Sequence, residues 1–143
     1  MSPANAFVKK QKIKFQHVDY AGIVFYPRYL EMLNELVEDW FADALNLSFG
    51  DMHTTAGIPT VDLSVQFRRA ARLEEVLDLS LWVEEIGNSS VLCAFRFENQ
   101  NNQLILEGKV RLVYVSISDD RKTIKSKEFP NELRREMEKY LKN

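Results

Sequence analysis

Apolar and polar residues alternate in three central stretches of the chain, which predicts three half-buried β-strands. Every second residue is Val, Leu, Phe or Cys from Val61 to Phe67, from Leu77 to Val83 and from Val91 to Phe97. Residues 104–117 form a longer apolar stretch, and from Val113 to Ile117 both parities are apolar, which predicts a strand buried on both faces. Because the connectors are short and rich in turn residues, we expect strands that follow each other in the chain to pair antiparallel.

A second pattern, with apolar residues at helical spacing, runs from about Pro27 to Leu45 and predicts one long helix. Its apolar positions are Tyr29, Leu33, Leu36, Val37, Trp40, Phe41, Ala44 and Leu45. Leu30 and Met32 widen this stripe, so the helix should be buried over most of its circumference. An edge-type strand is expected at residues 7–15 and a short surface helix from Asn131 to Leu141.

The order of these elements predicts an α+β domain in which a curled five-stranded antiparallel sheet surrounds a long central helix. With 143 residues, the chain fits a single domain, taken here as residues 1–143. One copy would leave a short N-terminal strand and the edge of the final long strand exposed, and a second copy could cover them.

Composition narrows the functional classes. The net charge of −2 argues against a nucleic-acid binder, and no apolar run approaches membrane-spanning length. Cys93 is the only cysteine, which excludes an internal disulfide and agrees with a reducing, cytoplasmic setting. We expect no signal peptide at the N-terminus. Two histidines and one cysteine without ligand spacing predict no metal site.

The chemistry is concentrated just before the long helix. Asp19 precedes Gly22 by three residues, and Pro27 stands where a helix is expected to begin. Backbone N–H groups from Val24 to Arg28 should therefore lie unpaired beside the Asp19 carboxylate. A carboxylate next to a helix N-terminus can attack a carbonyl carbon, or activate water against it, while the helix end stabilises the oxyanion. From local sequence alone, Asp19 is equally well explained as a turn or cap residue.

This segment resembles the signature of the 4-hydroxybenzoyl-CoA thioesterase branch of the hotdog-fold thioesterases, roughly D-x-x-G-x-V-x-x-x-x-Y. The matching residues are Asp19, Gly22, Val24 and Tyr29. The resemblance implies that Asp19 is the catalytic carboxylate, as nucleophile or as general base. It also implies that the backbone N–H near Tyr26 binds the thioester oxygen, and that Gly22 lets the thioester approach the backbone. Alone, Gly22 only predicts a tight turn.

The resemblance also implies where the substrate binds. Ile58, Pro59 and Thr60 match the segment that lines the coenzyme A arm in relatives, and Phe49 falls near an aromatic residue that packs on the acyl ring. Ser89 and Ser90 stand in the turn where the aromatic-substrate bacterial relative has a basic run for the nucleotide phosphates. Here that turn is Gly87-Asn88-Ser89, so the phosphates would be bound by backbone and hydroxyl groups, or by Arg121, Lys122 or Lys125.

The expected activity is hydrolysis of an acyl- or aroyl-CoA thioester to the free acid and CoA, with no cofactor because CoA is part of the substrate. Acyl carrier protein stays open as the carrier, and a homodimer or homotetramer is implied as the assembly. One rival is a hotdog 2-enoyl-thioester hydratase or dehydratase with His17 as base. Otherwise His17 is a loop histidine that packs or is solvated, or that contacts the substrate as a candidate binding residue. The other rival is a non-catalytic acyl-thioester binding module.

Overall fold

A computed structural model describes residues 2–142. The strands are β1 (Phe7–Lys12), β2 (Ala56–Gly57), β3 (Thr60–Phe67), β4 (Val76–Ile86), β5 (Ser90–Glu98), β6 (Leu104–Val113), β7 (Val115–Ile117) and β8 (Ile124–Ser126). The helices are α1 (Pro27–Asp39), α2 (Phe49–Met52) and α3 (Asn131–Glu138), with a 3-10 turn η1 (Phe15–His17) and a π-helical turn η2 (Trp40–Ala44).

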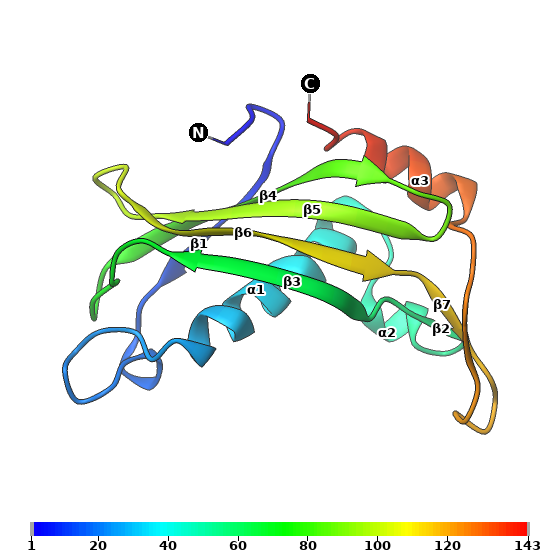
Figure 1. Cartoon of the computed structure of the whole chain (residues 1–143), viewed down its shortest axis with the longest axis horizontal. Helices are drawn as coiled ribbons and strands as arrows, with labels where there is room; N and C mark the ends of the chain where they lie inside the picture. The colour runs from blue at the N-terminus through cyan, green and yellow to red at the C-terminus, as the bar shows by residue number, and fades with distance from the viewer. Residues whose placement is uncertain (1, 143) are drawn as a thin grey trace.

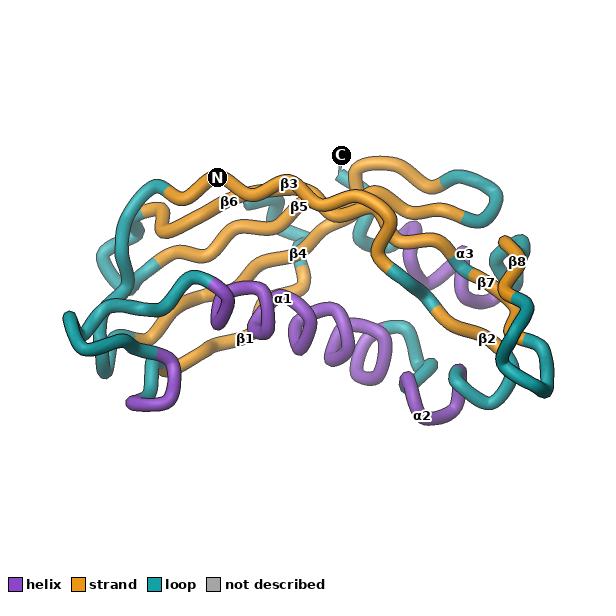
Figure 2. The backbone as a smooth tube through the Cα atoms, turned by 60° about the horizontal axis from the view of Figure 1, so that its bottom comes forward, coloured by secondary structure: helices purple, strands orange, loops and turns teal. Residues whose placement is uncertain are grey.

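The main sheet has five antiparallel strands in the order β1-β4-β5-β6-β3 and is not closed. It curves around α1, which lies along its concave face (Figures 1 and 2). The predicted architecture, a long helix surrounded by a curled five-stranded antiparallel sheet, is confirmed.

Burial of the helix explains the position of α1. Leu36, Trp40 and Phe41 are almost completely inaccessible to solvent and pack in one core with the inward residues of β4 and β5. The helix continues past Asp39 in the π-helical turn η2, where the Leu45 N–H donates to the Trp40 carbonyl 3.0 Å away. The wider turn adds a residue and lets both Trp40 and Phe41 face the core.

The prediction that strands pair in chain order is confirmed for β4 with β5 and for β5 with β6, but it is wrong for β3. β3 pairs instead with β6, at the sheet edge opposite β1, with Val65 opposite Gly108. The reason lies in residues 68–75, which connect β3 to β4. This connector is not a tight hairpin, because its backbone bonds to the loop before α1, as in the 3.0 Å contact from the Val24 N–H to the Ala71 carbonyl.

One edge of the main sheet is β1, the N-terminal strand, and the other is β3, not the final long strand as the sequence predicted. β6 lies between β5 and β3. The expected single strand over residues 104–117 is also divided, since β6 ends at Val113 and β7 joins a smaller sheet in the order β2-β7-β8. Tyr114 stands at the break, with its N–H bonded to the Ser89 carbonyl at 2.7 Å and its ring packed on Phe129.

The C-terminal helix is shorter than predicted because the chain after it joins the sheet edge. Val83 donates its N–H to the Tyr140 carbonyl and accepts from the Lys142 N–H, each at 2.8 Å. Leu133 and Met137 attach α3 to the core. No helix within residues 2–142 has the length and apolar character needed to cross a membrane.

Candidate active site

The loop between η1 and α1 is cross-linked by its own backbone. The Asp19 N–H donates to the Ile23 carbonyl, and the Gly22 N–H donates to the Asp19 carbonyl, both at 3.0 Å. Gly22 has a φ of 77°, a left-handed conformation that glycine adopts without the steric penalty of a Cβ atom. This glycine therefore allows the turn that presents Asp19.

The Asp19 carboxylate is half-buried and only partly used by the fold. Its Oδ1 atom accepts the Ala21 N–H at 2.8 Å, which is the hydrogen bond of an Asx-turn. Within residues 2–142 the carboxylate forms no ion pair, and Oδ2 has no hydrogen-bond partner. One oxygen orients the side chain, and the other is available for chemistry.

The helix start offers one free donor beside this loop. Tyr26 is the N-cap residue of α1, and Pro27, at the first helical position, has no N–H. Sequence reasoning predicted unpaired N–H groups from Val24 to Arg28, which is wrong for Val24, Phe25 and Arg28, whose N–H groups donate to Ala71, His17 and Phe25. For the Tyr26 N–H, the described residues provide no acceptor.

The connector of residues 68–75 holds this loop from the other side. The Leu73 N–H donates to the Gly22 carbonyl at 3.1 Å, and Ile23 and Arg72 form an antiparallel bridge. The Ala71 N–H donates to the Tyr29 hydroxyl at 3.1 Å. Burial raises the pKa of Tyr29, while the Ala71 hydrogen bond acts in the opposite direction. The loop that bears Asp19 is thereby attached to α1 and to the end of β3.

His17 has a structural position in the same loop. Its Nδ1 atom accepts the Lys14 N–H at 2.8 Å, and its carbonyl accepts the Phe25 N–H at 3.0 Å. Burial lowers the pKa of His17, opposed by the nearby Glu35 carboxylate. The ring borders a broad polar hollow of about 730 Å³ along the outer side of α1, together with Arg28 and Glu35. Because Nδ1 of His17 accepts the Lys14 N–H, its lone pair is already used in a hydrogen bond of the fold.

A small apolar cavity of about 200 Å³ lies between α1, α2, β3 and β6. Its lining residues are Leu30, Leu33, Asn34, Val37, Phe49, Ile58, Thr60, Leu63, Val110 and Leu112. The fold thus brings together three residues that were predicted to bind substrate: Phe49, Ile58 and Thr60. The lining is aliphatic or aromatic except for the Asn34 amide and the Thr60 hydroxyl, which have no hydrogen-bond partner within residues 2–142.

The other predicted residues lie elsewhere in a single chain. Asp19 and Pro59 do not line this cavity. Ser89 and Ser90 lie at the opposite end of β4 from the Asp19 loop, and the 11 residues of β4 span roughly 36 Å. The roles assigned to these serines stay predictions, and within one chain the serines are too far from Asp19 to share a site with it.

Sequence reasoning missed the contribution of α1 to the cavity. Leu30, Leu33, Asn34 and Val37 have the i, i+3, i+4, i+7 spacing of one helix face. That spacing identifies a shared face, but it does not tell whether the face packs tightly or borders a cavity.

Within residues 2–142, no group of three or more His, Cys, Asp or Glu side chains is arranged to bind a metal ion.

The sequence profile of the Thioesterase-like superfamily matches residues 13–137, and the chain belongs to this family. The resemblance to hotdog-fold thioesterases is thereby confirmed. No curated protein matches the sequence.

Solved structures agree with this assignment at the level of the fold. The Dynemicin thioesterase superposes with a TM-score of 0.86 at 16% identity, over 95% of this chain and 97% of its own. A 1,4-dihydroxy-2-naphthoyl-CoA thioesterase from Synechocystis gives 0.82 at 19% identity, over 92% and 95%. A mutant 4-hydroxybenzoyl-CoA thioesterase, complexed with 4-hydroxybenzoyl-CoA, gives 0.82 at 20% identity, over 94% and 99%.

Proposed function

We propose that this protein is a hydrolase of acyl- or aroyl-CoA thioesters. The observation that carries the proposal is the pairing of two unused groups on one cross-linked loop. Asp19 keeps one carboxylate oxygen without a partner, and the Tyr26 N–H at the start of α1 has no acceptor within residues 2–142. A nucleophile or base in the same loop as an oxyanion donor provides the two groups that acyl transfer requires.

In the proposed reaction, the thioester oxygen accepts the Tyr26 N–H and the carbonyl carbon faces Asp19. The carboxylate either attacks this carbon, which gives a mixed anhydride that water hydrolyses, or takes a proton from the water that attacks it. In both routes the C–S bond breaks, the CoA thiolate leaves, and the acid is released. The negative charge that develops on the oxygen is stabilised by the Tyr26 donor and the positive end of the α1 dipole.

The cavity size supports a compact acyl group. A dry apolar cavity of about 150 Å³ accommodates benzene in another protein, so about 200 Å³ fits a single substituted ring or a short aliphatic chain. Asn34 and Thr60 could accept or donate a hydrogen bond to a polar substituent. Two of the solved neighbours are thioesterases of hydroxylated aroyl-CoA esters, which favours an aroyl group.

A second copy of the chain is part of the proposal. β3 has one unpaired edge. Leu63 and Phe67, which stand opposite the buried Val110 and Leu106 of β6, are 40% and 51% exposed, and Val61, at the register shift of β3, is 57% exposed. A partner at this edge would cover these residues and close the cavity beside Leu63. We propose that the protein forms at least a homodimer. We also propose that it acts in the cytoplasm, because its single cysteine agrees with a reducing compartment.

The rivals are separated by their chemistry. A hydratase would need His17 as its base, but the Nδ1 atom of His17 is engaged by Lys14 and the ring is buried. A pure binding module would bind acyl-CoA, and its behaviour would not depend on the Asp19 carboxylate.

The deciding experiment is a panel of CoA esters (acetyl, hexanoyl, palmitoyl, benzoyl and 4-hydroxybenzoyl) in which the released thiol is measured. We expect turnover of the single-ring esters and at least about a hundredfold lower kcat for Asp19→Asn, the scale of a lost acid–base group. His17→Gln is the matched control, expected to retain most of the activity. Hydrolysis that persists in Asp19→Asn would refute the mechanism, and no hydrolysis of any ester by the wild type would refute the function.

A further inference from the structure

The connector between β3 and β4 places three arginines, Arg68, Arg69 and Arg72, within five residues. This connector is the segment that bonds to the Asp19 loop through Val24 and Gly22. We infer that Arg69 and Arg72 bind the phosphate groups of coenzyme A, an inference that rests on the proposed function.

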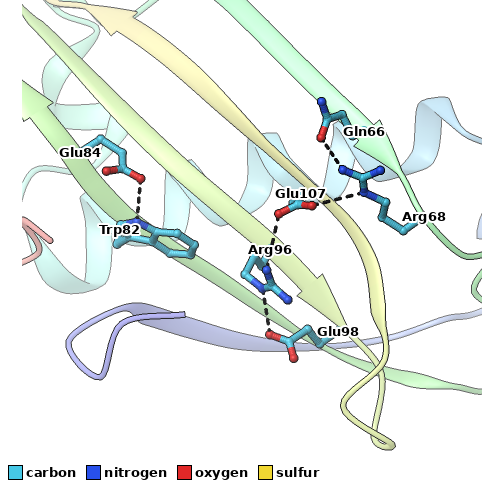
Figure 3. Close-up of polar contacts among 7 residues, drawn as sticks. All are labelled: Gln66, Arg68, Trp82, Glu84, Arg96, Glu98 and Glu107. Carbon is cyan, nitrogen blue, oxygen red and sulfur yellow. Dashed lines mark hydrogen bonds and ion pairs between the residues drawn. The ribbon is translucent and has the colours of Figure 1, made fainter. Parts of the chain in front are cut away.

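Arg68 does not share this role, because its guanidinium is already engaged on the outer face of the sheet. Its Nε atom forms an ion pair with Glu107 at 3.2 Å, and its Nη2 atom donates to the Gln66 side-chain oxygen at 2.7 Å. Glu107 in turn contacts Arg96, so the charge of Arg68 is part of a neutralised network (Figure 3).

The guanidinium groups of Arg69 and Arg72 are free by comparison. Neither forms an ion pair or a side-chain hydrogen bond within residues 2–142, and both side chains are exposed. Glu74 and Glu75 are the acidic residues of the connector. Glu75 binds the backbone N–H of Arg72 at 2.8 Å, not its guanidinium. Two unpaired cations therefore lie on the segment that supports the catalytic loop.

Arg69 also lines a hollow together with Tyr26, the residue whose N–H is the proposed oxyanion donor. This hollow has a volume of about 350 Å³, and Tyr26, Phe67 and Arg69 are among its lining residues. The rings of Tyr26 and Phe67 meet edge to face, with centroids 6.4 Å apart. A pantetheine arm that leaves the thioester at Tyr26 would cross this aromatic surface on its way to Arg69.

The reach of the substrate favours these arginines over the other basic residues. The arm from the thioester sulfur to the first phosphorus has about 13 bonds, which at peptide-like geometry span roughly 15 Å. Arg121, Lys122 and Lys125 lie on or next to the β7–β8 hairpin, at the Thr60 end of β3, whereas the Asp19 loop lies at its Phe67 end (Figure 1). The eight residues of β3 span about 26 Å, beyond that reach within one chain.

Phosphate is the ligand that unpaired arginines favour, because the planar guanidinium donates two parallel hydrogen bonds to it. The same phosphate chemistry occurs on the pantetheine arm of acyl carrier protein, and the experiment must distinguish the two carriers. Coenzyme A carries three phosphates, so we commit to it as the ligand.

The test is titration calorimetry of coenzyme A and of phosphate-free pantetheine against the intact protein. The variants are Arg69→Gln, Arg72→Gln and their combination. Lys122→Gln represents the rival hairpin, and Arg135→Gln on the exposed side of α3 is the matched control. We expect each arginine variant to weaken coenzyme A binding by about tenfold or more, the scale of a charged hydrogen bond, with pantetheine binding unchanged. The salt dependence of coenzyme A binding should also decrease.

Unchanged coenzyme A affinity in the double variant would overturn the inference, as would an equal loss for pantetheine or a larger loss in Lys122→Gln. Arg69→Lys, which keeps the charge, separates binding from folding and should recover part of the affinity. An effect confined to the KM of acyl carrier protein thioesters would overturn the choice of carrier.

Because calorimetry does not require turnover, a protein that binds through these arginines without hydrolysing any ester refutes only the proposed function. An active enzyme that binds coenzyme A without them refutes only this inference.

Discussion

The Oδ1 atom of Asp19 lies 2.8 Å from the backbone nitrogen of Ala21. The residue proposed for catalysis thus also holds the turn in which it stands, since Gly22 and Ile23 close the same loop through the Asp19 backbone. This double role decides how substitutions of Asp19 should be interpreted.

Asp19→Asn and Asp19→Ala are expected to separate chemistry from structure. In Asp19→Asn the asparagine amide oxygen can still accept the Ala21 N–H. The unfolding free energy of this variant should therefore stay within about 0.5 kcal/mol of the wild-type value. Asp19→Ala loses the bond and should cost about 1 kcal/mol more. Denaturant unfolding measures the stability of each variant, and ester hydrolysis measures its activity. We expect both variants to be inactive. Equal stability of the two variants would contradict the Asx-turn.

Tyr26→Pro should remove the oxyanion donor without removing a hydrogen bond of the fold. The φ of Tyr26 is −53°, which a proline ring accommodates, and its N–H has no acceptor within residues 2–142. We expect kcat to fall by about a hundredfold or more. Tyr26→Ala is the control, because it keeps the backbone donor and should lose far less. A Tyr26→Pro protein with normal kcat would place the donor elsewhere.

His17 should make the stability of the protein depend on pH. Burial lowers its folded-state pKa, and a protonated Nδ1 could no longer accept the Lys14 N–H. In the unfolded chain the pKa of His17 is about 6.5, and below this pH the unfolded chain binds more protons than the folded protein. The contribution of His17 to stability is therefore complete above this pH, and it is lost as the pH falls through the folded-state pKa.

The measurement is the difference in unfolding free energy between wild type and His17→Gln from pH 8 to pH 5. This difference should shrink toward the acid side. Glu31 and Glu35, which favour protonated His17, and Lys14 and Arg28, which oppose it, are present in both proteins. His53→Gln removes the exposed histidine and should keep the wild-type dependence. A difference that is constant with pH would exclude this role for His17.

Gly108→Ala should be strongly destabilising. A Cβ atom at this position would collide with the Ser64 carbonyl oxygen of the neighbouring strand and would lie 2.6 Å from Cζ of Phe95. The first contact is with backbone, so side-chain movement cannot relieve it, and we expect a loss of about 3 kcal/mol, the upper end of the usual cost of overpacking. Gly50→Ala is the control, because its nearest neighbour would be the Ser48 Oγ atom at 3.8 Å. Similar melting temperatures for the two variants would contradict the close approach of β3 to β6.

Leu63→Lys tests the proposed second copy at the β3 edge. A lysine there would place a charge in an apolar interface, so we expect a monomer by light scattering where the wild type is a dimer, with lower activity. Val8→Lys, on the exposed side of β1 at the opposite sheet edge, is the matched control and should remain dimeric. A monomeric wild type, or a dimeric Leu63→Lys, would contradict this interface.

Local patterns in the sequence predicted the main strands, the long helix and the turn that bears Asp19, but not the break between β6 and β7 or the early end of α3. Period-two alternation predicted the strands, helical spacing predicted α1, and the Asp19-to-Pro27 spacing predicted the loop before the helix. These features depend on residues close in the chain, so a single sequence contains them. The resemblance to thioesterases depended on the same short segment.

The tertiary structure decided which segments lie side by side. Alternation assigns side chains of β3 to a face, but it does not determine the neighbouring strand. β3 pairs with β6, and its connector bonds to the Asp19 loop instead of forming a tight hairpin to β4. The same long-range contacts occupy the N–H of Val24 and leave that of Tyr26 free. They also bring Asn34 to the cavity and Arg69 to the hollow beside Tyr26. Contacts between residues far apart in the chain arise only when the whole sheet closes over the helix, so no local pattern could specify them.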